Sequence, residues 1–302
     1  MNSSFEVHGR AINVRGRLVR IARLDGDKYH FIDDPKSLID GLQKCGARID
    51  LFTFMQKVDE PKPKYNYPME WDNLAVLPVS TYEHWFNHQI RSLPRNRTRQ
   101  AEKRGVTFRE VPLDDALVRG IHGIYNEVPV RQGRTYRHYG DDIATVYRET
   151  ATYLDHSLFI GAFLGETLIG FVKMVTDEAR TQANLMSIIA MIKHRDKAPT
   201  NALIAESVRA CAERGIPYLV YQNFSYFNRG GDSLSHFKEV NGFQRVDLPR
   251  YYVPLTLVGQ VAFRLGMHHR FRDRFPESLA TKLRRLQKYR HSRGSQPSAE
   301  AI

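Results

Sequence analysis

The stretch Phe237-Lys238-Glu239-Val240-Asn241-Gly242-Phe243 decides the fold prediction. It comes shortly after a strand–loop–helix–strand pattern at residues 186–222. It predicts a short helix that carries one lysine, Lys238, just before a Gly-Phe turn and faces the mouth of a small parallel sheet. Open α/β sheets bind their ligands at this edge. A positive charge at this place is what a group-transfer enzyme would use.

The pattern around this stretch predicts an α/β (α+β) fold. Ile204, Val208 and Cys211 form an apolar stripe at helical spacing, and Gly215-Ile216-Pro217 ends that helix. The expected elements are strands at 158–164, 168–175 and 185–193, a helix at 201–214, a strand at 218–223, a helix at 233–240, and strands at 244–247 and 251–256.

The N-terminal part predicts further strands and helices. Asp25-Gly26-Asp27 indicates the turn of a hairpin between strands at 18–24 and 28–32. The capping box Ser80-Thr81-Tyr82-Glu83 begins a helix, and a short basic helix follows between Pro94 and Gly105. The other expected strands lie at 49–58, 73–79 and 106–111.

Two segments carry the positive charge. The chain has 45 Lys and Arg against 33 Asp and Glu, a net charge of +12. Residues 91–104 contribute +5 and residues 264–293 contribute +8, so the rest of the chain sums to −1. Such clusters favour polyanions, namely nucleic acid, an anionic membrane surface, a phosphate-bearing cofactor or an acidic carrier protein. The alternative is a solvated helix face.

The cysteine content and the N-terminus favour a reduced, cytoplasmic setting. Cys45 and Cys211 are too few for a disulfide framework and lack zinc-binding spacing, so no metal is expected. The first six residues do not resemble a signal peptide. The apolar run at 158–175 is interrupted by Gly165-Glu166 and contains Lys173, which favours two strands over a membrane span.

The segment before the helix at 201–214 is a candidate anion site. A strand that passes through a loop into a helix leaves backbone N–H groups at the positive end of the helix dipole. Arg195 and Lys197 add charge there, and Ala198, Thr200 and Asn201 allow a ligand close to the backbone. An ordinary loop with a polar cap is the alternative.

Taken in order, these motifs resemble the GNAT acyltransferase superfamily and within it the FemAB/FemX branch. The donor loop of the superfamily, (Q/R)xxGx(G/A), falls on 195–200, where Ala198 and Thr200 replace small residues of the pattern. The helix ending LYEKLGF falls on 237–243, with Lys238 at the tyrosine position. Residues 96–106 resemble the basic FemAB helix ending A-x-K-x-G-V, and 125–133 resemble Y-x-x-T-x-x-R-x-G, with Val128 at the threonine position.

The resemblance implies two tandem GNAT-like halves, a degenerate one at 1–155 and a second at 156–257 that carries the site. It implies an N-acyltransferase that moves an acyl or aminoacyl group from acyl-CoA or aminoacyl-tRNA to an amine-bearing acceptor. Lys238 would stabilise the oxygen that becomes negative, an effect worth about 3–4 kcal/mol for one such donor. The remaining candidates are Tyr221, His194 and His236 as proton acceptors, and Arg131, Tyr139 and Asn223 as substrate-binding residues.

The segment 258–302 changes character. Apolar residues at intervals of about four alternate with basic ones on both sides of Pro276, which predicts basic amphipathic helices followed by a disordered tail. These helices could dock on the domain, lie on an anionic membrane or guide an RNA. A non-catalytic module that binds RNA or an anionic membrane surface is therefore the main alternative to the enzyme, and an acyltransferase supplied by an acidic carrier protein is a third.

Overall fold

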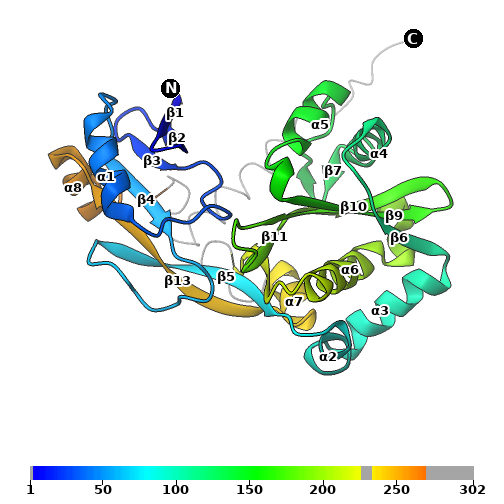
Figure 1. Ribbon diagram of the computed structural model, residues 1–302. Helices are drawn as coiled ribbons and strands as arrows, with labels where there is room; N and C mark the ends of the chain where they lie inside the picture. Colours follow the sequence, from blue (N-terminus) through cyan, green and yellow to red (C-terminus); the bar gives the residue numbers. More distant parts are fainter. Residues whose placement is uncertain (1–2, 226–232, 270–302) are drawn as a thin grey trace, which may run out of the picture.

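The computed structural model describes residues 3–225 and 233–269. In these residues one large mixed sheet runs through the whole molecule (Figure 1). Its eleven strands lie in the order β1-β2-β3-β4-β13-β5-β12-β11-β10-β9-β6, and β7 and β8 form a separate hairpin. The strands are β1 (Ser3–Val7), β2 (Arg10–Arg15), β3 (Ile21–Leu24), β4 (Leu51–Met55), β5 (Met69–Pro78), β6 (Val106–Glu110), β7 (Val130–Arg131), β8 (Arg134–Thr135), β9 (Ser157–Leu164), β10 (Thr167–Thr176), β11 (Gln182–Ala190), β12 (Tyr218–Asn223) and β13 (Gln244–Pro254).

The helices flank this sheet on both faces. On the right-hand side of Figure 1, α4 and α5 lie on one face of β9–β11, and α6 and α3 lie on the other. The helical segments are α1 (Pro35–Lys44), α2 (Tyr82–His84), the π-helical η1 (Trp85–Gln89), α3 (Ser92–Lys103), α4 (Asp115–Tyr125), α5 (Ile143–Thr150), the 3₁₀ turns η2 (Leu154–His156) and η3 (Ile192–Lys197), α6 (Pro199–Glu213), α7 (Ser233–Val240) and α8 (Leu257–Arg264).

The two ends of the sheet repeat one arrangement. The parallel pair β3 and β4 is connected through α1, and the parallel pair β11 and β12 is connected through α6. Between them, β5 pairs with β12, and β13 returns to pair with both β4 and β5. This exchange of strands joins the two ends into one sheet and agrees with the expected tandem GNAT-like architecture.

The stretch Phe237–Phe243 packs against the segment before α3. Trp85 is fully buried and its indole N–H donates to the carbonyl of Asn241 at 3.0 Å. Gly242 has φ +90, and a Cβ there would lie 3.2 Å from the carbonyl oxygen of Gln89. Glycine is therefore required both for the backbone angle and for the close approach.

Several sequence predictions need correction. The hairpin predicted at 18–24 and 28–32 is wrong, because β3 pairs with β2 and residues 25–30 form a loop. The strands predicted at 244–247 and 251–256 are one continuous strand, β13. Continuous pairing with β5 from Gln244 to Tyr251 explains that difference.

Other predictions agree with the structure or lie outside it. The run at 158–175 forms the hairpin of β9 and β10, and no helix in the described residues has the length and apolarity needed to cross a membrane.

The division of the chain at residue 155 differs from the packing. The elements α3, β6, α4 and α5 pack on the β9–β11 end, although the boundary predicted at 155 assigned them to the first half. Of the C-terminal basic helices, α8 is described and 270–302 lie outside the described residues.

Candidate active site

The parallel strands β11 and β12 separate after a short paired segment. Their register runs from Gln182–Tyr218 to Asn184–Val220, three pairs in all, whereas β11 continues for six more residues. Beyond Val220 the pairing of β12 with β5 shifts, and Gln222 adopts φ 49. The carboxyl ends of the two strands therefore diverge, and polar side chains gather at this opening.

Asn223, at the end of β12, joins both parts of the chain. Its backbone carbonyl accepts a hydrogen bond from Nζ of Lys238 on α7. Its side-chain oxygen accepts from Nζ of Lys28 at 3.3 Å, and its amide nitrogen donates to Asp72 on β5 at 2.8 Å. The backbone carbonyl of Lys28 in turn accepts from Asn184 on β11 at 3.2 Å. The 25–30 loop thus lies over the paired segment of β11 and β12.

A buried ionic cluster supports this loop. Arg250 on β13 donates to Asp27 at 2.8 Å and to Asp72 at 3.0 Å, and its side chain is 12% exposed. Burial alone would lower the pKa of Arg250, but the two carboxylates raise it above its ordinary value. Burial would raise the pKa of Asp27, but Arg250 and Arg23 hold it below its usual range. The cluster is therefore charged at neutral pH.

Lys28 brings an amine from the 25–30 loop into contact with the side chain of Asn223. Burial lowers the pKa of Lys28 from its ordinary value, and the neighbouring Asp72 opposes that change. The sequence analysis did not identify Lys28, Asp27, Asp72 or Arg250 as site residues. One signal was available: Arg250 interrupts the apolar segment 248–253.

Lys238 lies close to Asn223, but not as an exposed cation. Its side chain is fully buried, and its Nζ lies 4.8 Å from the ring centroid of Tyr221 in addition to its bond to Asn223. The prediction that Lys238 faces the mouth of the sheet is corrected accordingly, because α7 places it beneath the end of β12. Its amine therefore contacts the strand end and not the solvent.

Tyr221 is brought together with Lys238 and Asn223. Its ring packs edge-on against Phe243 at 5.8 Å between centroids and contacts the apolar core. Three predicted site residues, Lys238, Tyr221 and Asn223, thus converge on the end of β12. His194 was another predicted proton acceptor. Its pKa is lowered by burial first and then by the positive charges of Lys197 and Lys193, so its imidazole is neutral near pH 7.

The predicted donor loop forms η3 and the start of α6. Ala198 is buried in the left-handed region at φ 52, Pro199 begins the helix, and no side chain caps it. Backbone amides of this segment already have acceptors: those of Ile192 and Lys193 donate to Glu127 at 2.7 and 2.9 Å, and that of Ala198 donates to Arg195.

Few amides remain for an anion at this loop. The first turn of a helix has four unpaired N–H groups, of which Ala198 uses one and Pro199 lacks one. Thr200 and Asn201 therefore supply the remaining two. Of the predicted basic residues, Arg195 is exposed and Lys197 pairs with Asp196 at 3.2 Å.

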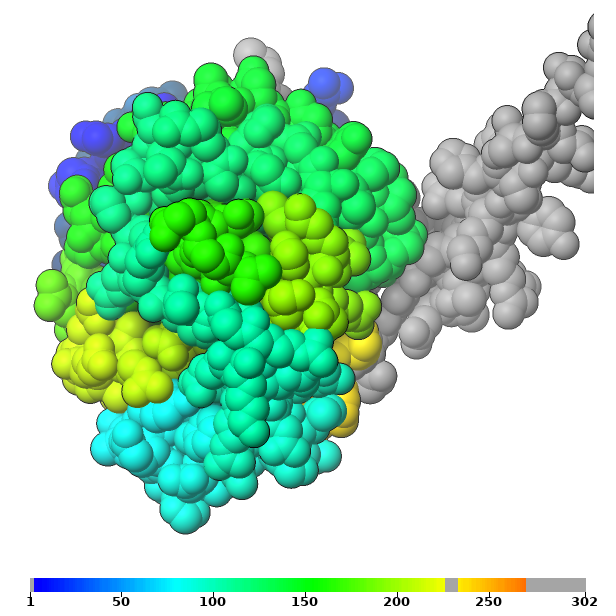
Figure 2. All heavy atoms as spheres, turned by 90° about the vertical axis from the view of Figure 1, so that its right-hand side faces the viewer, coloured from blue at the N-terminus to red at the C-terminus, as the bar shows by residue number. Residues whose placement is uncertain are grey.

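The basic helix α3 holds this loop in place. Arg104 donates to the carboxylate of Asp196 at 2.7 Å and Gln100 donates to its carbonyl at 2.6 Å. Figure 2 shows the teal surface of α3 directly against yellow-green surface that includes η3 and α6. Arg97, Arg99 and Lys103 remain exposed on α3, so part of the basic cluster is structural and part faces solvent.

Arg131 has structural partners. Its guanidinium donates to the carbonyl of Ala190 at 2.9 Å and to that of Ile124 at 2.8 Å, and it pairs with Glu127 at 3.2 Å. These bonds hold the end of β11 beside α4, and the binding of an anionic substrate group by Arg131 stays a prediction. Tyr139 is 46% exposed beside the same loop, and no contact in the described residues brings it to Asn223.

Comparison of the sequence with protein-family models and with curated proteins gave no match. Comparison of the structure with solved structures gave several. FemX aligns with a TM-score of 0.60 at 11% identity over 88% of this chain and 89% of that chain. L-PGS from Bacillus licheniformis aligns with a TM-score of 0.56 at 12% identity over 87% and 89%.

A third structure is the C-terminal DUF2156 domain of a putative lysylphosphatidylglycerol synthetase from Agrobacterium fabrum, with a TM-score of 0.56 at 12% identity over 87% of each chain. At such identities the comparison concerns the fold alone. The resemblance predicted from the sequence is confirmed at that level: this chain has the fold of FemX and of these two other structures.

Proposed function

We propose that this protein transfers an acyl or aminoacyl group from an activated donor to an amine, at the separated ends of β11 and β12. One observation carries the proposal: Asn223, at this opening, is held by Lys28, Lys238 and Asp72 from three other segments. A fold alone does not define a function. The proposal therefore depends on this polar site and on the buried charges that fix it.

The chemistry requires a positive potential at the end of β12. The amine nitrogen attacks the acyl carbonyl, a C–N bond forms, and the C–O or C–S bond to the donor breaks. The amine proton passes to a base, for which neutral His194 is the proposed group, and the leaving oxygen or sulfur takes up a proton. Lys28 is proposed to stabilise the oxyanion, and Lys238 to orient the strand end and add to the potential.

The donor proposed is an aminoacyl-tRNA in preference to a coenzyme A thioester. A pyrophosphate needs several backbone amides at the start of α6, but Ala198 already donates to the carbonyl of Arg195 and Pro199 has no N–H, which leaves the amides of Thr200 and Asn201. Beside it, α3 presents Arg97, Arg99 and Lys103 to solvent, which suits phosphates of a polynucleotide. The proposed partners are therefore tRNA and an amine-bearing acceptor.

A donor comparison tests this proposal. Purified protein is incubated with a radiolabelled aminoacyl-tRNA pool or with radiolabelled acetyl-CoA, together with amine-containing cell extracts. We expect label to move from tRNA to an amine and to form an alkali-stable amide. Transfer from acetyl-CoA instead would agree with an acyltransferase but contradict aminoacyl-tRNA as its donor. No transfer from either donor would contradict the proposed function.

The exposed basic residues of α3 also favour a second candidate, a non-catalytic module that binds RNA or an anionic membrane. Filter binding of uncharged tRNA and flotation with anionic vesicles distinguish it from the enzyme. In the non-catalytic case, exchange of Lys28 for Met should leave binding unchanged and no transfer should be found. In the enzyme case, the same exchange should reduce transfer.

A further inference from the structure

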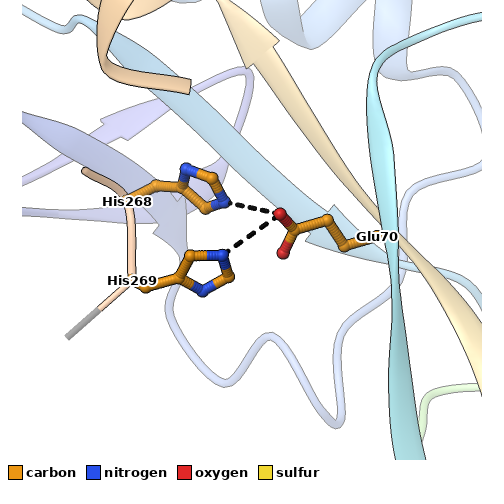
Figure 3. Close-up of side chains that lie close together, drawn as sticks. All are labelled: Glu70, His268 and His269. Atoms are coloured by element: carbon orange, nitrogen blue, oxygen red, sulfur yellow. Dashed lines mark hydrogen bonds and ion pairs between the residues drawn. The ribbon is translucent and has the colours of Figure 1, made fainter. Parts of the chain in front are cut away.

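Glu70, His268 and His269 bring three metal-binding atoms together outside the site described above. Glu70 lies on β5, and the two histidines follow α8 (Figure 3). Nε2 of His268 lies 2.9 Å from Oε1 of Glu70, and Nε2 of His269 lies 3.2 Å from the same oxygen. All three ligand atoms lie within 4.8 Å of one another. The three side chains therefore converge on one point.

The spacing of these atoms is close to that of a tetrahedral ion. Zinc binds histidine nitrogen and carboxylate oxygen at about 2.0–2.2 Å, which places neighbouring ligand atoms about 3.3 Å apart. The observed 2.9 and 3.2 Å are slightly shorter. Glu70 and His269, whose side chains are 36% and 41% exposed, can move outward to admit an ion. Water can occupy the fourth position.

His268 is a fixed ligand. Its side chain is 1% exposed, and its ring lies 4.5 Å from Tyr252 and 4.9 Å from Phe263, centroid to centroid. One buried and two accessible ligands thus form a site open to solvent on one side.

The second nitrogen of His268 limits the expected affinity. Nδ1 is buried and makes no well-formed hydrogen bond in the described residues, although the backbone of Ala262 lies near the ring. When Nε2 binds a metal, the proton must reside on Nδ1, and metal-binding histidines normally donate that proton to an acceptor. An unsatisfied buried N–H lowers the affinity by about ten- to a hundredfold. A micromolar site is therefore expected, weaker than a structural zinc centre.

We propose that Glu70, His268 and His269 bind a divalent transition metal ion, with zinc as the best fit to two imidazoles and one carboxylate. The ion would fasten the chain directly before the basic segment 270–293 to β5. Asp72 lies two residues from Glu70 on the same face of that strand. The proposal does not depend on the proposed transferase activity.

Zinc titration of untagged, metal-free protein by calorimetry at pH 7.5 tests the site. We expect one ion per chain with a micromolar Kd, and at least tenfold weaker binding for Glu70→Gln and for His269→Ala. Both exchanged side chains are partly exposed, so the fold should survive. His88→Ala is the matched control, since His88 is exposed and its ring lies 5.3 Å from that of His84, centroid to centroid; the zinc affinity of this variant should equal that of the wild type.

Cobalt provides an independent measurement. Co²⁺ in the wild type should give the visible absorption of a four-coordinate ion, and Glu70→Gln should lose it. The proposal is overturned if wild-type binding is weaker than about 100 µM, if the Glu70 and His269 variants bind as tightly as the wild type, or if exchange of His138, which lies near Asp141 and Glu149, abolishes binding instead.

Discussion

The side-chain amine of Lys238 donates to the backbone carbonyl of Asn223, and this bond joins α7 to the end of β12. The side chain of Asn223 accepts from Lys28 on the other side. Two lysines distant in the sequence thus act on one residue at the opening between β11 and β12. This arrangement gives the predictions that follow.

Exchange of Lys28 for Met should reduce transfer. The amine that reaches Asn223 is lost, whereas the backbone carbonyl of Lys28 still accepts from Asn184. Loss of one oxyanion donor reduces kcat by about 10²–10³-fold. Single-turnover transfer assays measure this effect, with the exposed Lys36→Met as control. Equal rates for the wild type and Lys28→Met would remove Lys28 from the reaction.

Exchange of Asp72 for Asn should destabilise the protein. Arg250 loses one of two carboxylates in a site where its side chain is 12% exposed. Removal of one partner from a buried ion pair costs about 3–5 kcal/mol. Urea unfolding measures the free energy of unfolding. The control Asp247→Asn, which disrupts the exposed pair with Arg245, should lower the free energy of unfolding by at most about 1 kcal/mol. If both variants lose a similar free energy of unfolding, the buried pair of Asp72 and Arg250 does not stabilise the protein more than an exposed pair does.

Lys173 should make the stability depend on pH. Its amine donates to the carbonyl of Thr150 at 2.9 Å, and burial lowers its pKa to about 8 from 10.5. Between these values the unfolded chain retains a proton that the folded chain has released, so stability rises with pH. From pH 8 to 10.5 the wild type should gain stability relative to Lys173→Met. A constant difference across this window would show an ordinary pKa.

Exchange of Glu127 for Gln should loosen η3, which contacts the basic helix α3 that is proposed to bind tRNA. The carboxylate accepts from the amides of Ile192 and Lys193 and pairs with Arg131. Hydrogen bonds to a charged acceptor contribute about 1.5–3 kcal/mol. We expect a higher KM for the donor and faster hydrogen exchange at 192–198, measured by mass spectrometry. Glu166→Gln, with a side chain 94% exposed, is the control; if both behave alike, Glu127 does not position the loop.

The sequence predicted the succession of strands and helices better than the site. Periodicity and turn residues located α6, β9, β10 and β12, because these elements are defined by local patterns. The 25–30 loop was misassigned because a Gly turn fits a hairpin locally, whereas Arg250 and Asn184 hold the loop elsewhere. Such contacts join residues more than 150 positions apart and leave no local signal.

The metal-binding cluster escaped detection for the same reason. His268 and His269 are adjacent, but their third partner, Glu70, lies 198 positions before His268 on another strand. Spacing motifs find ligands that one local element supplies. The prediction that Lys238 faces the mouth of the sheet was wrong for another reason. The helix that carries it was predicted, but the burial of its side chain depends on the packing of α7 against β12.

The most direct test of the account compares Lys238→Met with Lys173→Met in single-turnover transfer from aminoacyl-tRNA. Both lysines are buried, at 0% and 2% exposure, and donate to backbone carbonyls, but Lys173 lies on β10 and its amine contacts the end of α5. The two variants should lose similar stability. The account predicts at least a hundredfold lower transfer rate, at unchanged tRNA affinity, for Lys238→Met and an unchanged rate for Lys173→Met. Equal transfer rates for both variants and the wild type would contradict it.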